Sequence, residues 1–305
     1  MKNGIIKTIK KGIKERNLFS KILILIYIKL GYTNEKLFPL ELRNKNYLRL
    51  KKKYSKFINS IDDKTEIKKN EKEYRIIWIL WLQGIDNAPD IVKNCFASLK
   101  IHNSNCKIIL LDKNNLSTYI SLPENLIDKW ERGIISNIHM SDIIRIELLI
   151  NHGGVWVDST CFFTDDIPSW IFKEQFFSFK SEGRYDRSIV FESWFIYSKP
   201  QNPLLLSTRK MLYEYWSSNN YLCDYFLLHI FFTIASEKHK KLWDNIPFYT
   251  DLTPHLLAMN LFKKYDNKKI MYIKKQSFVH KLNYKNSSNE ISGTFYEKII
   301  KGELF

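Results

Sequence analysis

Dense apolar runs alternate with helical spacing in the body of the chain. The run RIIWILWLQG at 75–84 is rich in β-branched and aromatic residues and stops at Gly84, which predicts a buried strand that leads into a loop. A second run, KIILLD at 107–112, follows a helical pattern over 88–102. Strand, helix and strand in this order form the unit of a parallel sheet. The pattern therefore predicts an α/β fold.

A third helix and strand meet at a pair of glycines. Residues 136–151, SNIHMSDIIRIELLIN, carry apolar side chains at helical spacing and stop just before GG, where a left-handed cap is expected. The segment VWVD at 155–158 then predicts a short strand that ends at Asp158. Ligands of open α/β sheets gather beyond the carboxyl ends of the strands, so Asp158 marks the expected site.

Weaker patterns follow this point. They predict two further strands over 175–179 and 194–198, and then two helices around 203–216 and 221–236. In the second helix, the strongly apolar part opens at Asp224.

The charge divides the chain into two parts. Residues 1–75 hold 21 Lys and Arg against 8 Asp and Glu, which is +13 of the net +16. Within them, residues 2–32 mix Lys with Ile and Leu at spacings that fit an amphipathic helix. We therefore predict a basic helical N-terminal region at 1–74 and a domain at 75–305.

The basic N-terminal region has three interpretations. Its Lys residues are a solvated face, or they bind an anionic membrane surface beside an apolar face, or they bind nucleic acid. The third is not expected, because the Arg-rich, aromatic-interleaved pattern of base-stacking proteins is missing. The apolar stretch at 22–32 is about half of the roughly 20 residues that cross a bilayer.

The cysteines and the N-terminus favour a cytoplasmic protein. Four cysteines lie far apart, without the spacing of a zinc site or the density of a disulfide scaffold. The first 22 residues lack an apolar core followed by a small-residue cleavage site, so we expect no secretory signal.

Asp142 and Arg145 share one face of the predicted 136–151 helix. Spacing alone favours a surface ion pair. However, the order SDIIR, GG, apolar strand and Asp resembles glycosyltransferases of the capsular polysaccharide synthesis type. These are close to the DXD-containing sugar transferases, such as yeast mannosyltransferases and the glucosylating clostridial toxins. There, S-D-x-x-R leads into G-G-[VIY]-[YW]-x-D-x-[DT], and the resemblance extends over roughly residues 75–286, up to HKLNYK at 280–285.

The resemblance implies a GT-A fold and transfer of a hexose from a UDP-sugar with retention at the anomeric carbon. It assigns Asp142 and Arg145 to the hydroxyls of the donor sugar and Asp158 to ribose, sugar and metal. It also places Trp81 against the base and Gln83 in the nucleotide-sugar site. A buried structural role for Trp81 remains an alternative.

The expected metal site departs from the family pattern. Where relatives have D-x-D, this chain has Asp158, Ser159 and Thr160, so a hydroxyl replaces the second carboxylate. A divalent cation, Mn²⁺ or Mg²⁺, is expected on Asp158 and Thr160, with His280 as a further ligand. The alternative is that Lys281 or Lys285 neutralises the leaving diphosphate instead.

Two carboxylates are candidates for the catalytic role near the anomeric carbon or the acceptor hydroxyl. They are Glu192 in FESWF and Asp224 in DYFLLHI, and the sequence does not select between them. Asp224 also has a structural explanation as an N-terminal cap of the predicted helix. His229 in the same segment is more typical of a buried core histidine.

Together, the family resemblance and the charge of the N-terminal region imply a bacterial hexosyltransferase that is cytoplasmic and peripheral on the inner face of the cell membrane. Its acceptor is expected to be a lipid-linked oligosaccharide of a capsule or another surface glycan. The competing hypothesis is a basic protein that binds nucleic acid or membrane through its N-terminal region, with a catalytically inactive α/β body.

Overall fold

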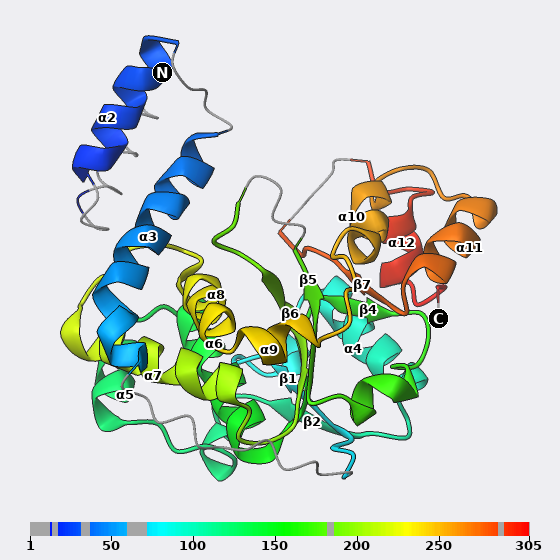
Figure 1. The fold of residues 1–305 in the computed structure, drawn as a ribbon. Coiled ribbons are helices and arrows are strands. Elements are labelled where there is room, and N and C mark those ends of the chain that lie inside the picture. Colours follow the sequence, from blue (N-terminus) through cyan, green and yellow to red (C-terminus); the bar gives the residue numbers. More distant parts are fainter. Residues whose placement is uncertain are drawn as a thin grey trace.

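A five-stranded sheet forms the centre of the computed structural model, in the order β2-β1-β3-β6-β5 (Figure 1). The structure describes residues 13, 18–31, 37–59, 72–181, 186–285 and 290–304. The strands are β1 (Ile76–Leu80), β2 (Lys107–Leu111), β3 (Gly154–Val157), β5 (Phe176–Lys180) and β6 (Phe191–Ser198). The pairs β1–β2 and β1–β3 are parallel, whereas β6 runs antiparallel to both β3 and β5. The predicted α/β class is confirmed.

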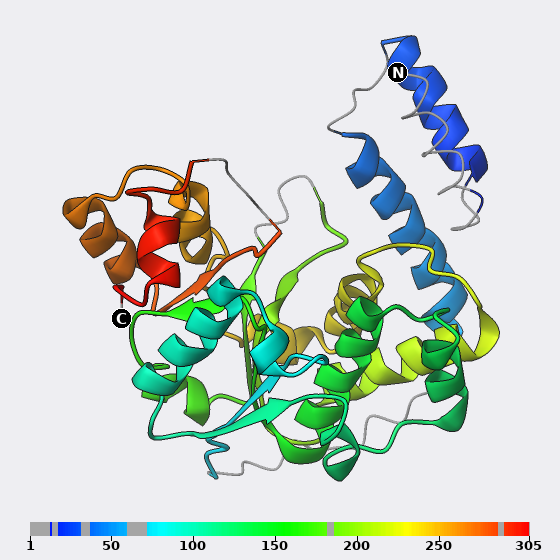
Figure 2. The ribbon, with the colours of Figure 1, turned by 180° about the vertical axis from the view of Figure 1, so that it is seen from behind.

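Side chains alternate along the strands and enter two cores. Trp78 and Trp156 point into a core shared with the helices on one face of the sheet, whereas Ile77 and Val155 pack into a core on the other face. The first core is covered by α5 (Glu124–Glu131), α6 (Asn137–His152), α7 (Pro203–Ser218) and α8 (Leu227–Lys238). Leu99 of α4 (Asp90–His102) packs into the second core, so helices lie on both faces (Figure 2).

A smaller C-terminal unit packs beside α4. It contains α10 (Leu256–Asn260), α11 (Asn267–Gln276) and α12 (Phe295–Ile300), which share a third core with α4. A separate two-stranded sheet pairs β4 (Cys161–Phe163) with β7 (Val279–Lys281) in antiparallel fashion. The remaining short elements are α9 (Lys240–Asp244) and the 3-10 turns η1 (Ile85–Asn87), η2 (Leu116–Thr118), η3 (Ser169–Lys173) and η4 (Thr253–His255).

The basic N-terminal region contains a helix that packs onto the body. Helix α3 (Phe38–Asn59) buries Tyr47, Leu50, Tyr54 and Ile58 in the same core as α7 and α8. These four positions are spaced as one stripe of a helix. The proposed boundary at residue 75 stays a prediction, but α3 shares a core with the sheet.

Helix α2 (Leu18–Lys29) lies beside the outer end of α3, away from the sheet (Figures 1 and 2). It falls within the helix predicted for residues 2–32, of which 2–12, 14–17 and 32 lie outside the described residues. In the described parts of the chain, no helix combines the length and the apolar content needed to cross a bilayer.

The glycine pair at 153 and 154 lets β3 lie against β1. Gly153 ends α6 with a φ of 67°, and Gly154 begins β3 with a φ of 94°. A Cβ at Gly153 would lie 2.7 Å from a ring carbon of Pro200, and one at Gly154 would lie 2.4 Å from the carbonyl oxygen of Ile76. Both positions therefore require glycine. The positive φ of Gly153 at the end of α6 agrees with the expected helix cap, whereas the close approach of Gly154 to β1 was not predicted.

Replacing Gly154 by alanine should lower the free energy of unfolding by about 3 kcal/mol, because it adds both backbone strain and a clash with the β1 backbone. Gly133 is the matched control, since its φ is 69° but a Cβ there would meet nothing within 4 Å. Gly133→Ala should cost only about 1 kcal/mol. Urea unfolding followed by circular dichroism measures both, and equal losses would contradict this account of the glycine pair.

Candidate active site

A cavity of about 730 Å³ opens beyond the carboxyl ends of β1 and β3. Its walls come from the segment after β1, the first half of α6, the turn after β3 and the segment after β7. The size is that of a small-molecule site. Seven of the residues predicted for the site line it, namely Trp81, Gln83, Asp142, Arg145, Asp158, Thr160 and Lys281.

Helix α6 presents Asp142 and Arg145 to this cavity. The helix begins after Ser136, whose side chain accepts a hydrogen bond from the backbone N–H of His139, and ends at the glycine pair. The Arg145 guanidinium lies 3.1 Å from Asp142 Oδ1 and is 4.9 Å from the ring centroid of Trp156. Arg145 is only 4% exposed, so this is not the surface pair that spacing alone suggested.

Asp158 receives hydrogen bonds on both carboxylate oxygens. Arg145 Nη2 and Trp156 Nε1 donate to Oδ1 at 3.2 and 2.9 Å, and Lys281 Nζ donates to Oδ2 at 2.9 Å. Burial acts to raise the pKa of Asp158, but the charges of Lys281 and Arg145 outweigh it and lower the pKa to about 2. Asp158 is therefore ionised at neutral pH and is held in one orientation.

Lys281 reaches the cavity from the C-terminal part of the chain. Strand β7 pairs with β4, which sets Lys281 opposite Cys161. From there Nζ contacts Asp158 Oδ2 and also donates to Thr160 Oγ1 at 2.6 Å. Burial acts to lower the pKa of Lys281, but Asp158 outweighs it and raises the pKa, so the ammonium stays charged.

Two aromatic side chains form another wall of the cavity. Trp81 and Tyr284 both line it and meet edge to face, with ring centroids 5.6 Å apart. Trp81 Nε1 is buried without a hydrogen-bond partner, and the ring also packs against the core that α4 shares with the C-terminal unit. Trp81 therefore has a structural contact as well as a place in the cavity.

His280 points away from the cavity. It neighbours Lys281 on β7, where successive side chains face opposite ways, and its Nε2 lies 3.0 Å from Thr164 Oγ1. Burial lowers the pKa of His280 to about 3, so the ring is neutral. The structure thus does not bring this predicted metal ligand to Asp158.

The side chains do not fit the expected divalent cation as they lie. Mn²⁺ and Mg²⁺ need several oxygen ligands around one point. Among the described residues, no three His, Cys, Asp or Glu side chains come together in that way. In the cavity, Asp158 and Thr160 both face the ammonium of Lys281 instead.

Glu192 lies on β6 beside the cavity but is not among its lining residues in the described chain. Its neighbour Ser193 lines the cavity, and Trp194 packs in the core on the opposite face of the sheet. Burial, with a smaller effect of the nearby Asp251 charge, raises the pKa of Glu192 to about 8. A neutral carboxylic acid is therefore the stable form at pH 7.

Glu192→Gln should change how stability depends on pH. Between pH 4.5 and about 8 the unfolded chain has lost this proton while the folded chain keeps it, so Glu192 makes the wild type less stable as pH rises. We expect the stability difference, variant minus wild type, to grow over this window. Urea unfolding at several pH values measures it, and a difference that does not vary with pH would contradict the raised pKa.

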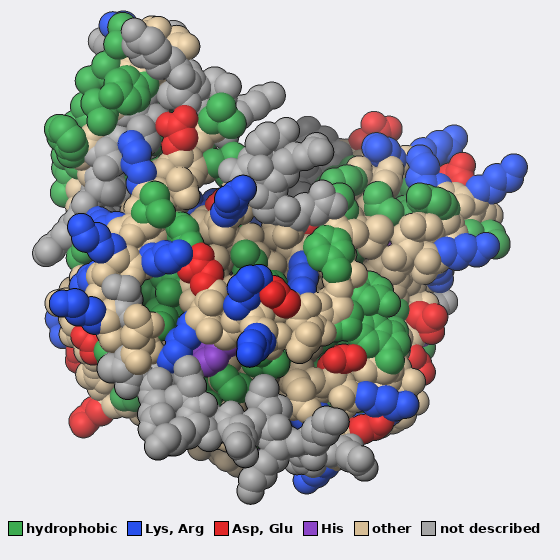
Figure 3. Space-filling model, in the orientation of Figure 1, with side chains coloured by type: hydrophobic (Ala, Val, Ile, Leu, Met, Phe, Trp, Pro, Cys, Tyr) green, Lys and Arg blue, Asp and Glu red, His purple; other side chains and the backbone are tan. Residues whose placement is uncertain are grey.

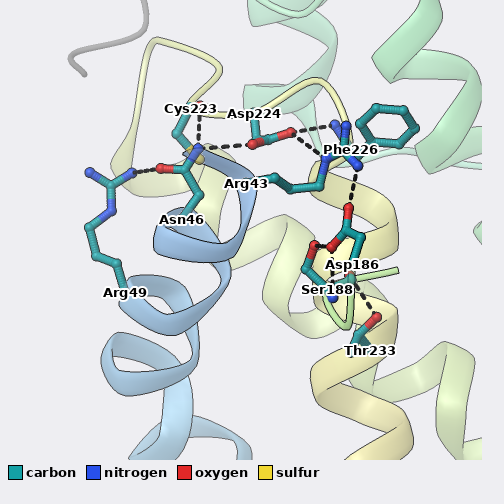
Figure 4. Close-up of polar contacts among 9 residues, drawn as sticks. All are labelled: Arg43, Asn46, Arg49, Asp186, Ser188, Cys223, Asp224, Phe226 and Thr233. Carbon is teal, nitrogen blue, oxygen red and sulfur yellow. Dashed lines mark hydrogen bonds and ion pairs between the residues drawn. The ribbon is translucent and has the colours of Figure 1, made fainter. Parts of the chain in front are cut away.

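Asp224 lies outside the cavity lining and contacts α3 (Figure 4). Helix α8 begins at Leu227, three residues later than the predicted opening at Asp224, and Phe226 stands at its N-cap position without a side-chain cap. Asp224 instead accepts hydrogen bonds from Phe226 N at 3.0 Å and from Asn46 Nδ2 at 2.9 Å. The prediction that it caps a helix was wrong, because a long-range partner holds it in a turn.

The cavity lining also includes polar and aromatic residues that were not predicted as site residues. Among them are Tyr225 and His229, from the turn after Asp224 and from α8, and Tyr284. Burial lowers the pKa of His229 to about 4, and its Nδ1 is buried without a partner. Nothing in the local pattern marked Tyr225, because its segment read as a continuous helix.

A comparison with protein families identifies the family of this chain. The family model described as "Capsular polysaccharide synthesis protein" matches residues 29–299. The chain belongs to this family. The resemblance seen in the sequence is thereby confirmed at the level of the family, and the match runs from before α3 into α12 of the C-terminal unit.

Solved structures also include distant likenesses to this member of the capsular polysaccharide synthesis family. The PaToxG glycosyltransferase is 15% identical, with 78% of this chain and 99% of that chain covered and a TM-score of 0.40. That likeness is too distant to support an argument. A comparison with curated proteins found no match.

Proposed function

We propose that this family member is a retaining glycosyltransferase of GT-A type that transfers a hexose from a UDP-sugar. The observation that carries the proposal is the linked set of Asp142, Arg145, Asp158 and Lys281 around one cavity at the carboxyl ends of parallel strands. Capsular polysaccharides are built from sugars, so the family match supports a sugar substrate.

The residues of the cavity have complementary roles in this proposal. Asp142 and Arg145 bind hydroxyls of the hexose, Asp158 binds ribose and sugar, and Trp81 with Gln83 binds the base. Charge-assisted hydrogen bonds are directional, which suits the discrimination of one hexose epimer from another. The ion pairs fix these side chains before the donor arrives, so little ordering is needed on binding.

The transfer step needs stabilisation of a leaving diphosphate. The bond between the anomeric carbon and the phosphate oxygen breaks, and its electron pair stays on that oxygen. The acceptor hydroxyl oxygen forms the new bond to the anomeric carbon on the same face, and its proton passes to the leaving phosphate oxygen. Cationic side chains near the diphosphate would stabilise the developing charge.

A panel of UDP-hexoses tests the proposed activity, with UDP release as the measurement. We expect turnover of one or a few donors, and Asp158→Asn should lower the rate at least about 100-fold because donor and side chains are no longer aligned. Asp128→Asn on the exposed face of α5 is the matched control and should keep full activity. If no nucleotide sugar is bound or hydrolysed, the proposed function fails.

The acceptor is proposed to be a lipid-linked oligosaccharide at the inner, anionic face of the cell membrane. Large apolar side chains are exposed on and just after α2, where they gather on its outer face (Figure 3). They are Phe19, Ile22, Ile26, Tyr27 and Leu30. Apolar side chains next to a strongly basic segment suit peripheral binding to an anionic leaflet.

Liposome flotation tests this location. The full chain should float with anionic vesicles and much less with neutral ones, because about 1 kcal/mol per basic residue comes from the anionic surface. Deleting residues 1–31 should abolish flotation while retaining α3 and its buried contacts. Equal recovery on both kinds of vesicle, or no loss after the deletion, would contradict the membrane proposal.

A further inference from the structure

The ammonium of Lys281 lies between the two side chains at which relatives with a D-x-D motif would hold a metal ion. Its Nζ is 2.9 Å from Asp158 Oδ2 and 2.6 Å from Thr160 Oγ1. We propose that Lys281 takes the place of the divalent cation and that the donor diphosphate is bound by protein cations alone. This inference rests on the proposed function and concerns how the same site holds its donor.

A metal ion would have to displace existing contacts of Asp158. Oδ1 already accepts two hydrogen bonds, from Arg145 and Trp156, and Oδ2 accepts one from Lys281. A cation at the usual distance of about 2.1 Å from Oδ2 would lie within a few ångströms of the ammonium. Two positive charges that close repel each other.

Backbone pairing holds the ammonium in this position. The register of β4 and β7 sets Cys161 opposite Lys281, and the N–H of Leu282 donates to the carbonyl oxygen of Thr160 at 2.9 Å. The Lys281 side chain is 22% exposed, which leaves part of it open to the cavity. The register therefore places Lys281 within reach of Thr160, and the contacts of Nζ with Asp158 and Thr160 hold the ammonium there.

The Lys281 ammonium has one N–H group left that can donate a hydrogen bond to the diphosphate. A lysine has three N–H groups, and Asp158 with Thr160 occupies two of them. Among the described residues, three cations line the cavity, Arg145, Lys281 and Lys285, against two carboxylates, Asp142 and Asp158. The surplus of positive charge suits a multiply charged anion.

The chemistry of Thr160 agrees with the replacement of the metal ion by the Lys281 ammonium. A carboxylate at position 160 would bind a divalent cation directly, whereas a threonine hydroxyl is a weaker, neutral ligand. The hydroxyl instead accepts a hydrogen bond from the ammonium that replaces the cation. During transfer Lys281 stays protonated and donates to the phosphate oxygen that takes the electron pair of the broken bond.

The first experiment measures binding of UDP to the wild-type protein by calorimetry. The Kd should agree within about twofold in EDTA and in excess Mn²⁺. In parallel, electron paramagnetic resonance of Mn²⁺ should show only the free ion and the Mn²⁺–UDP complex. Adding the protein should give no further signal of bound Mn²⁺. UDP binding that requires Mn²⁺ would overturn the inference.

Variants of position 281 supply the second experiment. Lys281→Met should weaken UDP binding about 10- to 100-fold, because one charge-assisted hydrogen bond is lost. Lys281→Arg keeps the positive charge and should retain most of the wild-type affinity. Lys301→Met on the surface of α12 is the matched control and should bind like the wild type. The double variant Lys281→Met, Thr160→Asp should regain UDP binding only with Mn²⁺.

The outcomes separate this inference from the proposed function. Binding of UDP that is lost in EDTA keeps the transferase proposal and overturns the role of Lys281. Unchanged UDP affinity in folded Lys281→Met also overturns that role. No binding of UDP under any condition overturns the UDP-donor proposal, and with it the inference.

Discussion

Arg145→Lys should lower kcat/KM for hexose transfer about 10- to 100-fold, with the fold intact. Arg145 lies 3.1 Å from Asp142 through Nη1 and 3.2 Å from Asp158 through Nη2. A lysine has a single nitrogen and cannot bridge both carboxylates in this way. Asp142 and Asp158 would then lose their fixed spacing, and the donor hexose would be bound in less productive orientations.

The matched control for this variant lies on α7 and pairs with the helix that carries Arg145. Arg209 pairs with Glu147 of α6 at 3.2 Å, and neither residue lines the cavity in the described chain. Arg209→Lys should leave kcat/KM unchanged within about twofold. Steady-state UDP release with the preferred donor measures both variants. If both lose activity equally, Arg145 acts through the stability of α6 and not through the cavity.

Arg43→Ala should lower the free energy of unfolding by about 3 kcal/mol, because it leaves two largely buried carboxylates without their cation. The Arg43 side chain is 14% exposed, pairs with Asp186 and lies 3.9 Å from Asp224 (Figure 4). Its guanidinium also stacks 3.9 Å from the ring centroid of Phe226. The turn held in this way carries Tyr225, a wall of the cavity.

Lys51→Met is the control on the same helix. Lys51 pairs with Glu237 at 2.9 Å, but the two side chains are 47% and 39% exposed. Such an exposed pair adds at most about 1 kcal/mol to the free energy of unfolding, so this variant should unfold at nearly the wild-type urea concentration. A loss in Arg43→Ala no larger than in Lys51→Met would show that the buried ion cluster does not stabilise the packing of α3.

Local patterns predicted the part of the site that α6 and β3 build. Three local patterns predict a helix, a turn and a strand in this order. They are the helical spacing of 136–151, the glycine pair and the apolar segment after it, and the structure has α6 and β3 there. Spacing also placed Asp142 and Arg145 on one face. That Asp158 joins them came from the family resemblance, because contact between a helix and the next strand depends on how the two pack.

Other parts of the site depend on contacts between distant segments. Strands β4 and β7 have three residues each, too short for an alternating pattern, so their pairing and the position of Lys281 beside Thr160 are not visible locally. Asp224 looked like a helix cap because its partner Asn46 is 178 positions away. The local sequence around Asp224 is typical of a helix start, but the hydrogen bond from Asn46 holds Asp224 in the turn before α8.

The charge pattern hid the packing of α3. Its many Lys and Arg residues made the region look separate from the body, although Tyr47, Leu50, Tyr54 and Ile58 form a buried stripe. A basic helix can bury one face and keep its charges in water. The charge of a segment therefore predicts its solvent-exposed face better than its membership of a core.

A crystal structure of the protein with a bound UDP-hexose tests the central claim most directly. We predict the hexose within hydrogen-bonding distance of Asp142 and Arg145, the base against Trp81, and the diphosphate on Lys281 with no metal ion between them. A nucleotide bound elsewhere would contradict the proposed site. A Mn²⁺ ion on Asp158, with Lys281 turned away, would contradict the replacement of the metal.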